Sequence, residues 1–331
     1  MNRIFYADPG GYYFHIGIIF SVILFGFFKS EVCFSKFMMM NRVTVIGLGP
    51  MGQSIAKSYL AKGYEVHLWN RTRSKADDLV QSGGIFHSHI SAAINESELI
   101  IVSLTNYDIF YVVLHESTEN LQGKVVVNLS SGTPEEVRKA KDWLELFGAG
   151  FLSGGIMVPP PLVGKKDPNS YTFYSGDKAV FDRYQSHLEV LSRTDYKGDE
   201  IGLAMLFYQA SLNVLYASIT GIVQSYAIIK SANIDAKAFE PYMQGFLNFL
   251  PYLVQDANIP EEIDTKTYDG SQQSLKMMLA GAKHVTETSR EAHLDYSVPE
   301  SIEKLFQETV NSGFGENGTT SIVETIRRTN A

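Results

Sequence analysis

The chain has 331 residues, of which 45% are hydrophobic and 19% charged, and its net charge at pH 7 is −8. This length accommodates about two domains, and the composition is that of an ordinary globular protein. No concentrated basic face is visible, so we expect no nucleic-acid partner. The one cysteine, Cys33, lies near the N-terminus. The rest of the chain therefore contains no disulfide, no cysteine nucleophile and no thiolate metal site, and we expect no metal.

The first 39 residues differ in character from the rest. Residues 12–28 are almost wholly apolar, and a run of this length is the short end of a membrane span. Three interpretations fit this hydrophobic extension. Translation starts at Met38, Met39 or Met40, so that the preceding residues are upstream sequence; or residues 12–28 anchor the protein in a membrane; or a signal peptide is removed. The signal peptide is the least favoured, because no clear cleavage site follows.

From Val43 onward, short apolar runs alternate with helical stretches. Strands are predicted at 43–49, 65–70, near Ile85, 99–104, 124–130, 151–158, 171–176 and near Thr194–Tyr196. Helices are predicted at 51–62, around 74–81, around 89–96 and at 134–147. This alternation indicates right-handed βαβ units and a mostly parallel sheet.

The character changes after Gly198. Residues 199–230 contain no proline and are mostly apolar, which predicts a buried helix of about 30 residues. Further helices are predicted near 236–255, 270–290 and 299–312. The predicted fold is an α/β Rossmann domain (40–198) followed by an all-α domain (199–331), linked by a long interdomain helix. Since so long an apolar helix is hard to bury in a small monomer, we expect a homodimer in which the helical domains intertwine.

A glycine motif stands where the first predicted strand meets the first predicted helix. It consists of Gly47, Leu48, Gly49, Pro50, Met51 and Gly52. In the G-x-G-x-x-G pattern, the first glycine allows the tight turn, the second lets the backbone approach a pyrophosphate and the third lets helix pack on strand. The alternative is a glycine turn of purely structural use. The strand–turn–helix context favours a dinucleotide cofactor held at the helix N-terminus.

The end of the second predicted strand distinguishes NAD from NADP. NAD enzymes usually place Asp or Glu there, to bind the ribose hydroxyls. Here the residues are Asn70, Arg71, Thr72, Arg73 and Lys75. No carboxylate would repel a 2′-phosphate, and the cations and the hydroxyl are suited to hold it. The alternative is a solvated basic helix start, which is disfavoured because cations at a helix N-terminus oppose its dipole. We therefore predict NADPH.

Two further segments follow predicted strands. Leu104 and Thr105 come after one strand and Ser131 after the next. Ligands of open α/β sheets bind at this edge, so these residues are candidates for contact with the nicotinamide half. Helix capping by Thr105 or Thr133 is an equally good interpretation.

At this point the sequence resembles the β-hydroxyacid dehydrogenase superfamily, which shares the 6-phosphogluconate dehydrogenase-like NADP-binding domain, and within it the imine reductases and reductive aminases. The resemblance spans about 42–328 and is carried by VIGLGPMGQSIA, WNRTRSKA, VNLSSGTPEE, IMVPPPLVGKKD, GLAMLFYQASL and residues 263–299. It implies an enzyme that reduces the C=N bonds of small-molecule imines to amines with NADPH; a cytoplasmic location is expected separately, because a reducing cytosol suits a chain with one cysteine. The resemblance also implies a homodimer with swapped helical domains that line the substrate site.

The predicted interdomain helix bears on the reaction. Hydroxyacid dehydrogenases of the superfamily carry a lysine there, which helps a carbonyl become an alkoxide. Residues 198–229 contain no Lys, Arg or His. This fits an iminium, because an ammonium would repel it. Imine reductases resemble one another in placing Asp or Tyr at one position of this helix, and GLAMLFYQ places Tyr208 there. The resemblance implies that Tyr208 donates a proton to the substrate nitrogen or anchors it; packing is the alternative.

Two other functions remain open from the sequence. A 3-hydroxyisobutyrate-type dehydrogenase is supported by Ser153, because a similar Ser-Gly-Gly anchors a substrate carboxylate in those enzymes, but the missing lysine disfavours it. The second is a non-catalytic NADPH-binding protein, tethered to a membrane if residues 12–28 form an anchor.

Overall fold

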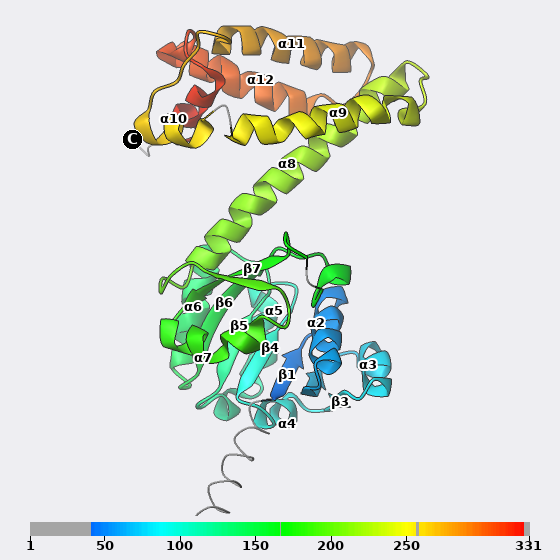
Figure 1. The fold of residues 1–331 in the computed structure, drawn as a ribbon, viewed down its shortest axis with the longest axis vertical. Helices are drawn as coiled ribbons and strands as arrows, with labels where there is room; N and C mark the ends of the chain where they lie inside the picture. The colour runs from blue at the N-terminus through cyan, green and yellow to red at the C-terminus, as the bar shows by residue number, and fades with distance from the viewer. Residues whose placement is uncertain (1–40, 166, 256–257, 328–331) are drawn as a thin grey trace, which may run out of the picture. The chain divides into compact units, whose positions relative to one another are not determined.

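The computed structural model describes residues 41–165, 167–255 and 258–327, so the hydrophobic extension lies outside the described residues. The chain forms two compact units, which divide between Leu212 and Asn213. The first unit contains an eight-stranded sheet and the second is helical (Figure 1). The predicted combination of a Rossmann sheet with an all-α region is therefore confirmed.

The sheet has the strand order β3-β2-β1-β4-β5-β6-β7-β8. The bounds are β1 (Arg42–Ile46), β2 (Glu65–Trp69), β3 (Ile85–Phe86), β4 (Leu99–Val102), β5 (Val125–Asn128), β6 (Gly150–Ile156), β7 (Tyr171–Gly176) and β8 (Arg193–Tyr196). Every pairing is parallel except that of β6 with β7. The first six strands follow the order of a dinucleotide-binding sheet, whose ligand crevice opens where the order reverses, beside β1 and β4.

Two hydrophobic cores cover the two faces of the sheet. Alternate residues of the buried strands point to opposite faces, as Val43 and Val45 do on one side and Ile46 on the other. One core packs against α2 (Pro50–Ala61), α3 (Asp77–Gln81) and α7 (Lys178–Leu188). The other packs against α4 (Ile90–Asn95), α5 (Tyr107–His115), α6 (Pro134–Glu145) and the start of α8 (Leu203–Ser231).

The long predicted helix is present as α8, but the expectation that it is buried is wrong for the single chain. Of its side chains, only Ala204 and Met205 are buried. Large apolar side chains such as Val214, Tyr216 and Val223 lie exposed along it. Within the described part of the chain, α8 is the one helix long and apolar enough to cross a membrane, a property it shares with the core helices of soluble proteins.

Within its described residues, the second unit contains the later part of α8 and five further α-helices. These are α9 (Ala236–Gln255), α10 (Ile259–Thr265), α11 (Leu275–Glu291), α12 (Ser297–Thr309) and α13 (Ile322–Ile326). Its buried core is small and is formed by Leu275, Leu279 and Phe306. The unit thus buries little of its apolar surface within one chain.

Candidate active site

A pocket of about 320 Å³ opens at the carboxyl ends of β1, β2 and β4. Ten of the residues predicted for the cofactor line it: Gly47, Gly49, Pro50, Met51, Asn70, Arg71, Thr72, Lys75, Leu104 and Thr105. The lining also includes Trp69, Ser103, Ile109 and Val113, which the sequence did not single out. Leu48 and Gly52 are buried beneath it, while Ser131 and Tyr208 lie outside it.

The three glycines of the motif have distinct physical roles. Gly47 has φ +92°, and a Cβ there would lie 2.2 Å from the carbonyl oxygen of Ser103. A Cβ on Gly52 would lie 1.8 Å from the carbonyl oxygen of Gly47, so that helix α2 could not pack on the turn. A Cβ on Gly49 would meet nothing within 4 Å. Gly49 therefore borders open space at the N-terminus of α2, the position at which a pyrophosphate fits.

Asn70 connects the glycine turn to the segment that follows β2. Its Oδ1 accepts a hydrogen bond from the backbone N–H of Leu48 at 2.9 Å. Its Nδ2 donates to the backbone carbonyl of Thr72, also at 2.9 Å. One amide side chain thus holds two loops at the pocket, and it does so without placing a negative charge there.

Two of the three predicted cations line the pocket. Neither Arg71 nor Lys75 forms an ion pair with any other residue that the structure describes, so both charges are available to a ligand. Arg73 is placed differently, since its guanidinium pairs with Asp77 at 2.8 Å and lies 4.5 Å from the ring centroid of Phe86. The pocket is thus positively charged without Arg73, which suits an anionic group such as a 2′-phosphate.

The structure shows which of the two threonines, Thr105 or Thr133, caps a helix. Thr133 caps α6, because its Oγ1 accepts from the N–H of Glu136, whose carboxylate in turn accepts from the N–H of Thr133. Helix α5 is capped by Asn106 instead of Thr105. Capping therefore explains Thr133 and not Thr105. The backbone N–H of Leu104 donates to Ser130 Oγ at 2.9 Å, which joins the loops after β4 and β5.

Tyr208 lies on the second turn of α8, against the end of β6. A Cβ built on Gly155 would lie 2.6 Å from the Cβ of Tyr208, so the missing side chain lets helix and strand approach closely. Ser153 points to the same face of β6 but is 0% exposed. Burial raises the pKa of the neighbouring Tyr107 hydroxyl well above its ordinary value. The side chains of Asn128 and Ser153 act in the opposite direction, but their effect is smaller. Ser153 is thus buried beside Tyr107 and exposes no hydroxyl at this surface to anchor a carboxylate.

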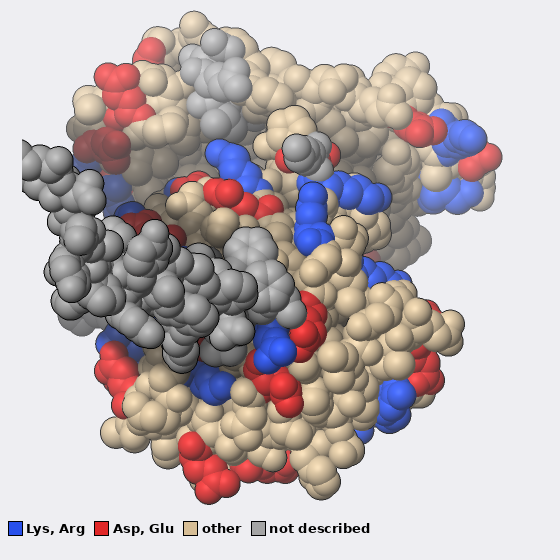
Figure 2. All heavy atoms as spheres, turned by 60° about the horizontal axis from the view of Figure 1, so that its bottom comes forward, with Lys and Arg blue, Asp and Glu red and all other residues tan. Residues whose placement is uncertain are grey.

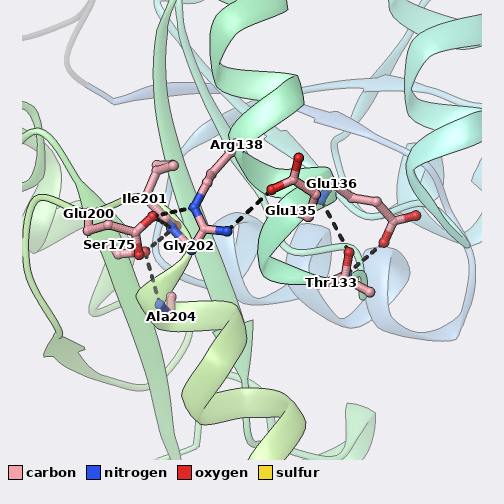
Figure 3. Close-up of polar contacts among 9 residues, drawn as sticks. All are labelled: Thr133, Glu135, Glu136, Arg138, Ser175, Glu200, Ile201, Gly202 and Ala204. Carbon is pink, nitrogen blue, oxygen red and sulfur yellow. Dashed lines mark hydrogen bonds and ion pairs between the residues drawn. The ribbon is translucent and has the colours of Figure 1, made fainter. Parts of the chain in front are cut away.

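The start of α8 is fastened to the sheet by polar contacts (Figure 3). Ser175 Oγ donates to the carbonyl of Ile201 at 2.5 Å and accepts from the N–H of Ala204 at 3.0 Å. Arg138 Nε pairs with Glu200 Oε1 at 2.9 Å. Burial acts to raise the pKa of Glu200, but hydrogen bonds from Arg138 and Gly202 bring it below its ordinary value. These contacts hold the start of α8, and Tyr208 lies on the next turn of this helix.

Outside the pocket, the described residues include charged side chains and potential metal ligands. On the face shown in Figure 2, Lys and Arg side chains are interspersed with Asp and Glu. Among the residues with a described placement, no group of three or more His, Cys, Asp or Glu side chains could hold a metal ion.

Comparison with known proteins agrees with this geometry. The family model for the NAD binding domain of 6-phosphogluconate dehydrogenase matches residues 42–202, and the model for the C-terminal domain of NADPH-dependent reductive aminase-like proteins matches residues 200–328. An NADPH-dependent reductive aminase from Aspergillus oryzae is 32% identical over 291 residues, which cover 86% of this chain and 97% of the relative.

Two solved structures are similar over nearly their whole length. An imine reductase from Bacillus cereus BAG3X2 is 42% identical, with a TM-score of 0.77 and coverage of 87% of this chain and 99% of the other. A reductive aminase from Aspergillus terreus, solved with NADPH and ethyl-5-oxohexanoate, is 29% identical, with a TM-score of 0.79 and coverage of 86% and 99%. These matches confirm the resemblance seen in the sequence. The chain belongs to the family of NADPH-dependent reductive aminases and imine reductases.

Proposed function

We propose that this chain is an NADPH-dependent oxidoreductase that reduces the C=N bonds of imines, cyclic imines included, to amines. The observation that carries the proposal is the start of α8, which brings Tyr208 against Gly155 and has no cationic side chain before Lys230. The substrate is a small molecule, as for the imine reductases and reductive aminases to which the chain is similar.

The pocket residues divide the work of holding the cofactor. The N-terminus of α2 would bind the pyrophosphate beside Gly49, and Arg71, Thr72 and Lys75 would hold the 2′-phosphate. Leu104, Thr105 and Ser131 would border the nicotinamide. NADPH supplies the hydride when bound. In domain terms, we assign cofactor binding to residues 40–198, and dimer formation and substrate binding to residues 199–331.

We assign the Tyr208 hydroxyl to the nitrogen of the bound substrate. Reduction of an imine adds one hydride to the carbon and one proton to the nitrogen, and the Tyr208 hydroxyl is the group that we assign to donate or hold that proton. An iminium loses its positive charge as the hydride arrives. A helix without lysine is suited to this substrate, because an ammonium nearby would raise the free energy of the bound cation.

The Tyr208→Phe variant tests the assignment. We expect kcat with 2-methyl-1-pyrroline to fall at least tenfold while the Kd for NADPH stays unchanged, because only the hydroxyl is removed. An unchanged kcat would refute the role of Tyr208. Incubation of the wild-type enzyme with 3-hydroxyisobutyrate and NADP distinguishes the alternatives: turnover there and none with the imine supports the hydroxyacid dehydrogenase, and no turnover with either supports a binding protein.

We further propose that a second copy of the chain covers the exposed apolar surface of α8, in a homodimer with swapped helical domains. A groove of about 640 Å³ between α8 and α9 is lined by apolar residues including Ile222, Met243 and Phe246. Val223, which is 62% exposed, lies on the same helix. The absence of charge along this surface favours an identical apolar partner over a polar one.

The oligomeric state tests this proposal. Val223→Glu should convert a dimer, measured by light scattering after gel filtration, to a monomer, because it buries an unpaired charge. Val112→Glu is the matched control, since Val112 is 64% exposed on α5. A wild-type monomer, or a dimer unaffected by Val223→Glu, would contradict the swapped arrangement.

The enzyme belongs in the cytoplasm by this proposal, because its reductant is found there. Residues 12–28 lie outside the described residues, so the membrane anchor stays a prediction. The mass of the native N-terminus tests it.

A further inference from the structure

The turn of α8 that carries Tyr208 is fastened on both sides. On the N-terminal side, Ser175 binds the backbone at Ile201 and Ala204. On the C-terminal side, the next residue along the helix, Gln209, binds the loop between β5 and α6. In the rest of α8 that belongs to the first unit, the one described side-chain hydrogen bond, from Ser211 to the Phe207 carbonyl, stays within the helix. Within the described residues of this unit, Gln209 is therefore the last polar link between this helix and the Rossmann sheet.

The Gln209 amide uses its nitrogen as a double donor. Its Nε2 lies 2.6 Å from the carbonyl oxygen of Gly132 and 3.2 Å from Ser131 Oγ. The Gly132 contact is short and partly buried, which strengthens it relative to an exposed hydrogen bond. One side chain thus touches the segment that contains Ser131, which we assign to the nicotinamide half of the cofactor site.

The loop that Gln209 binds is itself closely packed and hydrogen-bonded. A Cβ on Gly132 would lie 2.5 Å from ring atoms of Tyr107, so the backbone is packed directly on a buried ring. The following residue, Thr133, is held by the reciprocal capping contacts with Glu136 (Figure 3). Gln209 therefore binds to a fixed part of the sheet edge, which can hold a helix in place.

We propose that Gln209 is a positioning residue that sets the place of the Tyr208 hydroxyl relative to the loop carrying Ser131. This inference rests on the catalytic role proposed for Tyr208. At a rise of about 1.5 Å per residue, Gln209 lies roughly 7 Å along the helix from the Ser175 contact at Ala204. Removal of the Gln209 amide leaves the Ser175 contacts at Ile201 and Ala204, on the N-terminal side of this turn, and takes away the link to the β5–α6 loop. A misplacement of about 1 Å is enough to cost about 100-fold in rate.

The first test replaces Gln209 by Leu, which keeps the size and removes the donors. We expect kcat with 2-methyl-1-pyrroline to fall about 10- to 100-fold, with the Kd for NADPH within about threefold of wild type. Gln81→Leu is the matched control, because the same substitution is made at an exposed position on α3 whose side chain has no hydrogen bond within the described residues. The control should keep the wild-type kcat.

A double mutant separates this inference from the function on which it rests. If Gln209 acts through Tyr208, Gln209→Leu in a Tyr208→Phe background lowers kcat by less than about twofold, since the positioned hydroxyl is already absent. Full additivity overturns the inference. So does a wild-type kcat for Gln209→Leu when Tyr208→Phe is impaired. A wild-type kcat for Tyr208→Phe refutes the proposed role of Tyr208 and, with it, the positioning of its hydroxyl.

The Gln209→Glu variant provides a readout that a purely structural role would not give. Its carboxylate has no proton to donate to the Gly132 carbonyl, whereas its protonated form has one. The ratio of variant to wild-type kcat should therefore rise as the pH falls, over a range above the ordinary pKa of Glu. A ratio that does not change with pH overturns the inference, even if Gln209→Leu proves unstable.

Discussion

Replacement of Gly49 by Ala distinguishes a glycine needed by the ligand from a glycine needed by the fold. Gly49 has φ −67° and ψ −178°, a conformation that Ala adopts readily, and its added Cβ would meet no atom within 4 Å. The free energy of unfolding should therefore change by less than about 1 kcal/mol. The Cβ would, however, occupy the space that we assign to the pyrophosphate.

The expected loss of affinity follows from the hydrogen bonds at stake. A hydrogen bond to a charged group contributes about 1.5–3 kcal/mol. A methyl group that displaces the pyrophosphate from one backbone N–H of the glycine turn or α2 should raise the Kd for NADPH about 10- to 150-fold. Gly52→Ala is the contrasting variant. Its Cβ would lie 1.8 Å from the Gly47 carbonyl, so stability should fall by about 1–3 kcal/mol or more.

The assay combines NADPH titration by fluorescence with urea unfolding of the same samples. Gly49→Ala should lose affinity without losing stability, and Gly52→Ala should lose stability first. Wild-type affinity in a fully folded Gly49→Ala protein would refute the placement of the pyrophosphate. A large loss of stability in that variant would show that the open space beside Gly49 is needed by the fold.

Three further predictions concern other parts of the first unit. Arg71→Ala should raise the KM for NADPH about 10- to 150-fold and leave the KM for NADH nearly unchanged, because only NADPH carries the 2′-phosphate; equal effects on both would contradict this. Gly155→Ala should lower kcat at least tenfold, since its Cβ would lie 2.6 Å from the Cβ of Tyr208; wild-type turnover would rule out the close packing. Burial lowers the pKa of His187, so the unfolded state binds more protons below about pH 6.5 and the free energy of unfolding should decrease there, by up to about 1.4 kcal/mol per pH unit, until the pH passes below the folded pKa. In His187→Gln, the free energy of unfolding, measured with urea between pH 7.5 and 5, should fall less steeply with decreasing pH than in the wild type. An equally steep fall would count against His187 as its origin.

The sheet could be predicted because its strands are buried on both faces and therefore appear as continuous apolar runs. Helix α5 was missed for a related reason. Its sequence, YDIFYVVLH, is rich in aromatic and β-branched residues that favour strands. The cap by Asn106 and the packing of Phe110 and Leu114 on the sheet override this propensity. Helix α7, capped by Asp177, was also missed.

The cofactor pocket was predictable to a large extent because its residues follow strands at one sheet edge. Contacts between distant segments were not. Arg73 appeared equivalent to Arg71, but its guanidinium lies over Phe86 on a neighbouring strand. Gln209 gave no signal, since Ser131 and Gly132 are 78 and 77 residues away in the chain. Such pairs depend on how α8 lies against the β5–α6 loop, which local patterns do not encode.

The same geometry explains why the scaffold of a hydroxyacid dehydrogenase family suits an imine here. Oxidation of a hydroxyacid needs a cation near the reacting oxygen and an anchor for the carboxylate. Here we propose that Tyr208 takes the place of that cation on α8, and Ser153 is buried beside Tyr107. An ammonium about 4 Å from an iminium would raise its free energy by roughly 1–4 kcal/mol at effective dielectric constants of 80 to 20. Compared with a site that has an ammonium at this distance, a site without one would bind the iminium about 5- to 900-fold more tightly. Because this effect acts on an iminium and not on a neutral carbonyl, the lysine-free stretch of α8 would favour an imine over a carbonyl substrate whether the nitrogen is protonated before binding or by Tyr208.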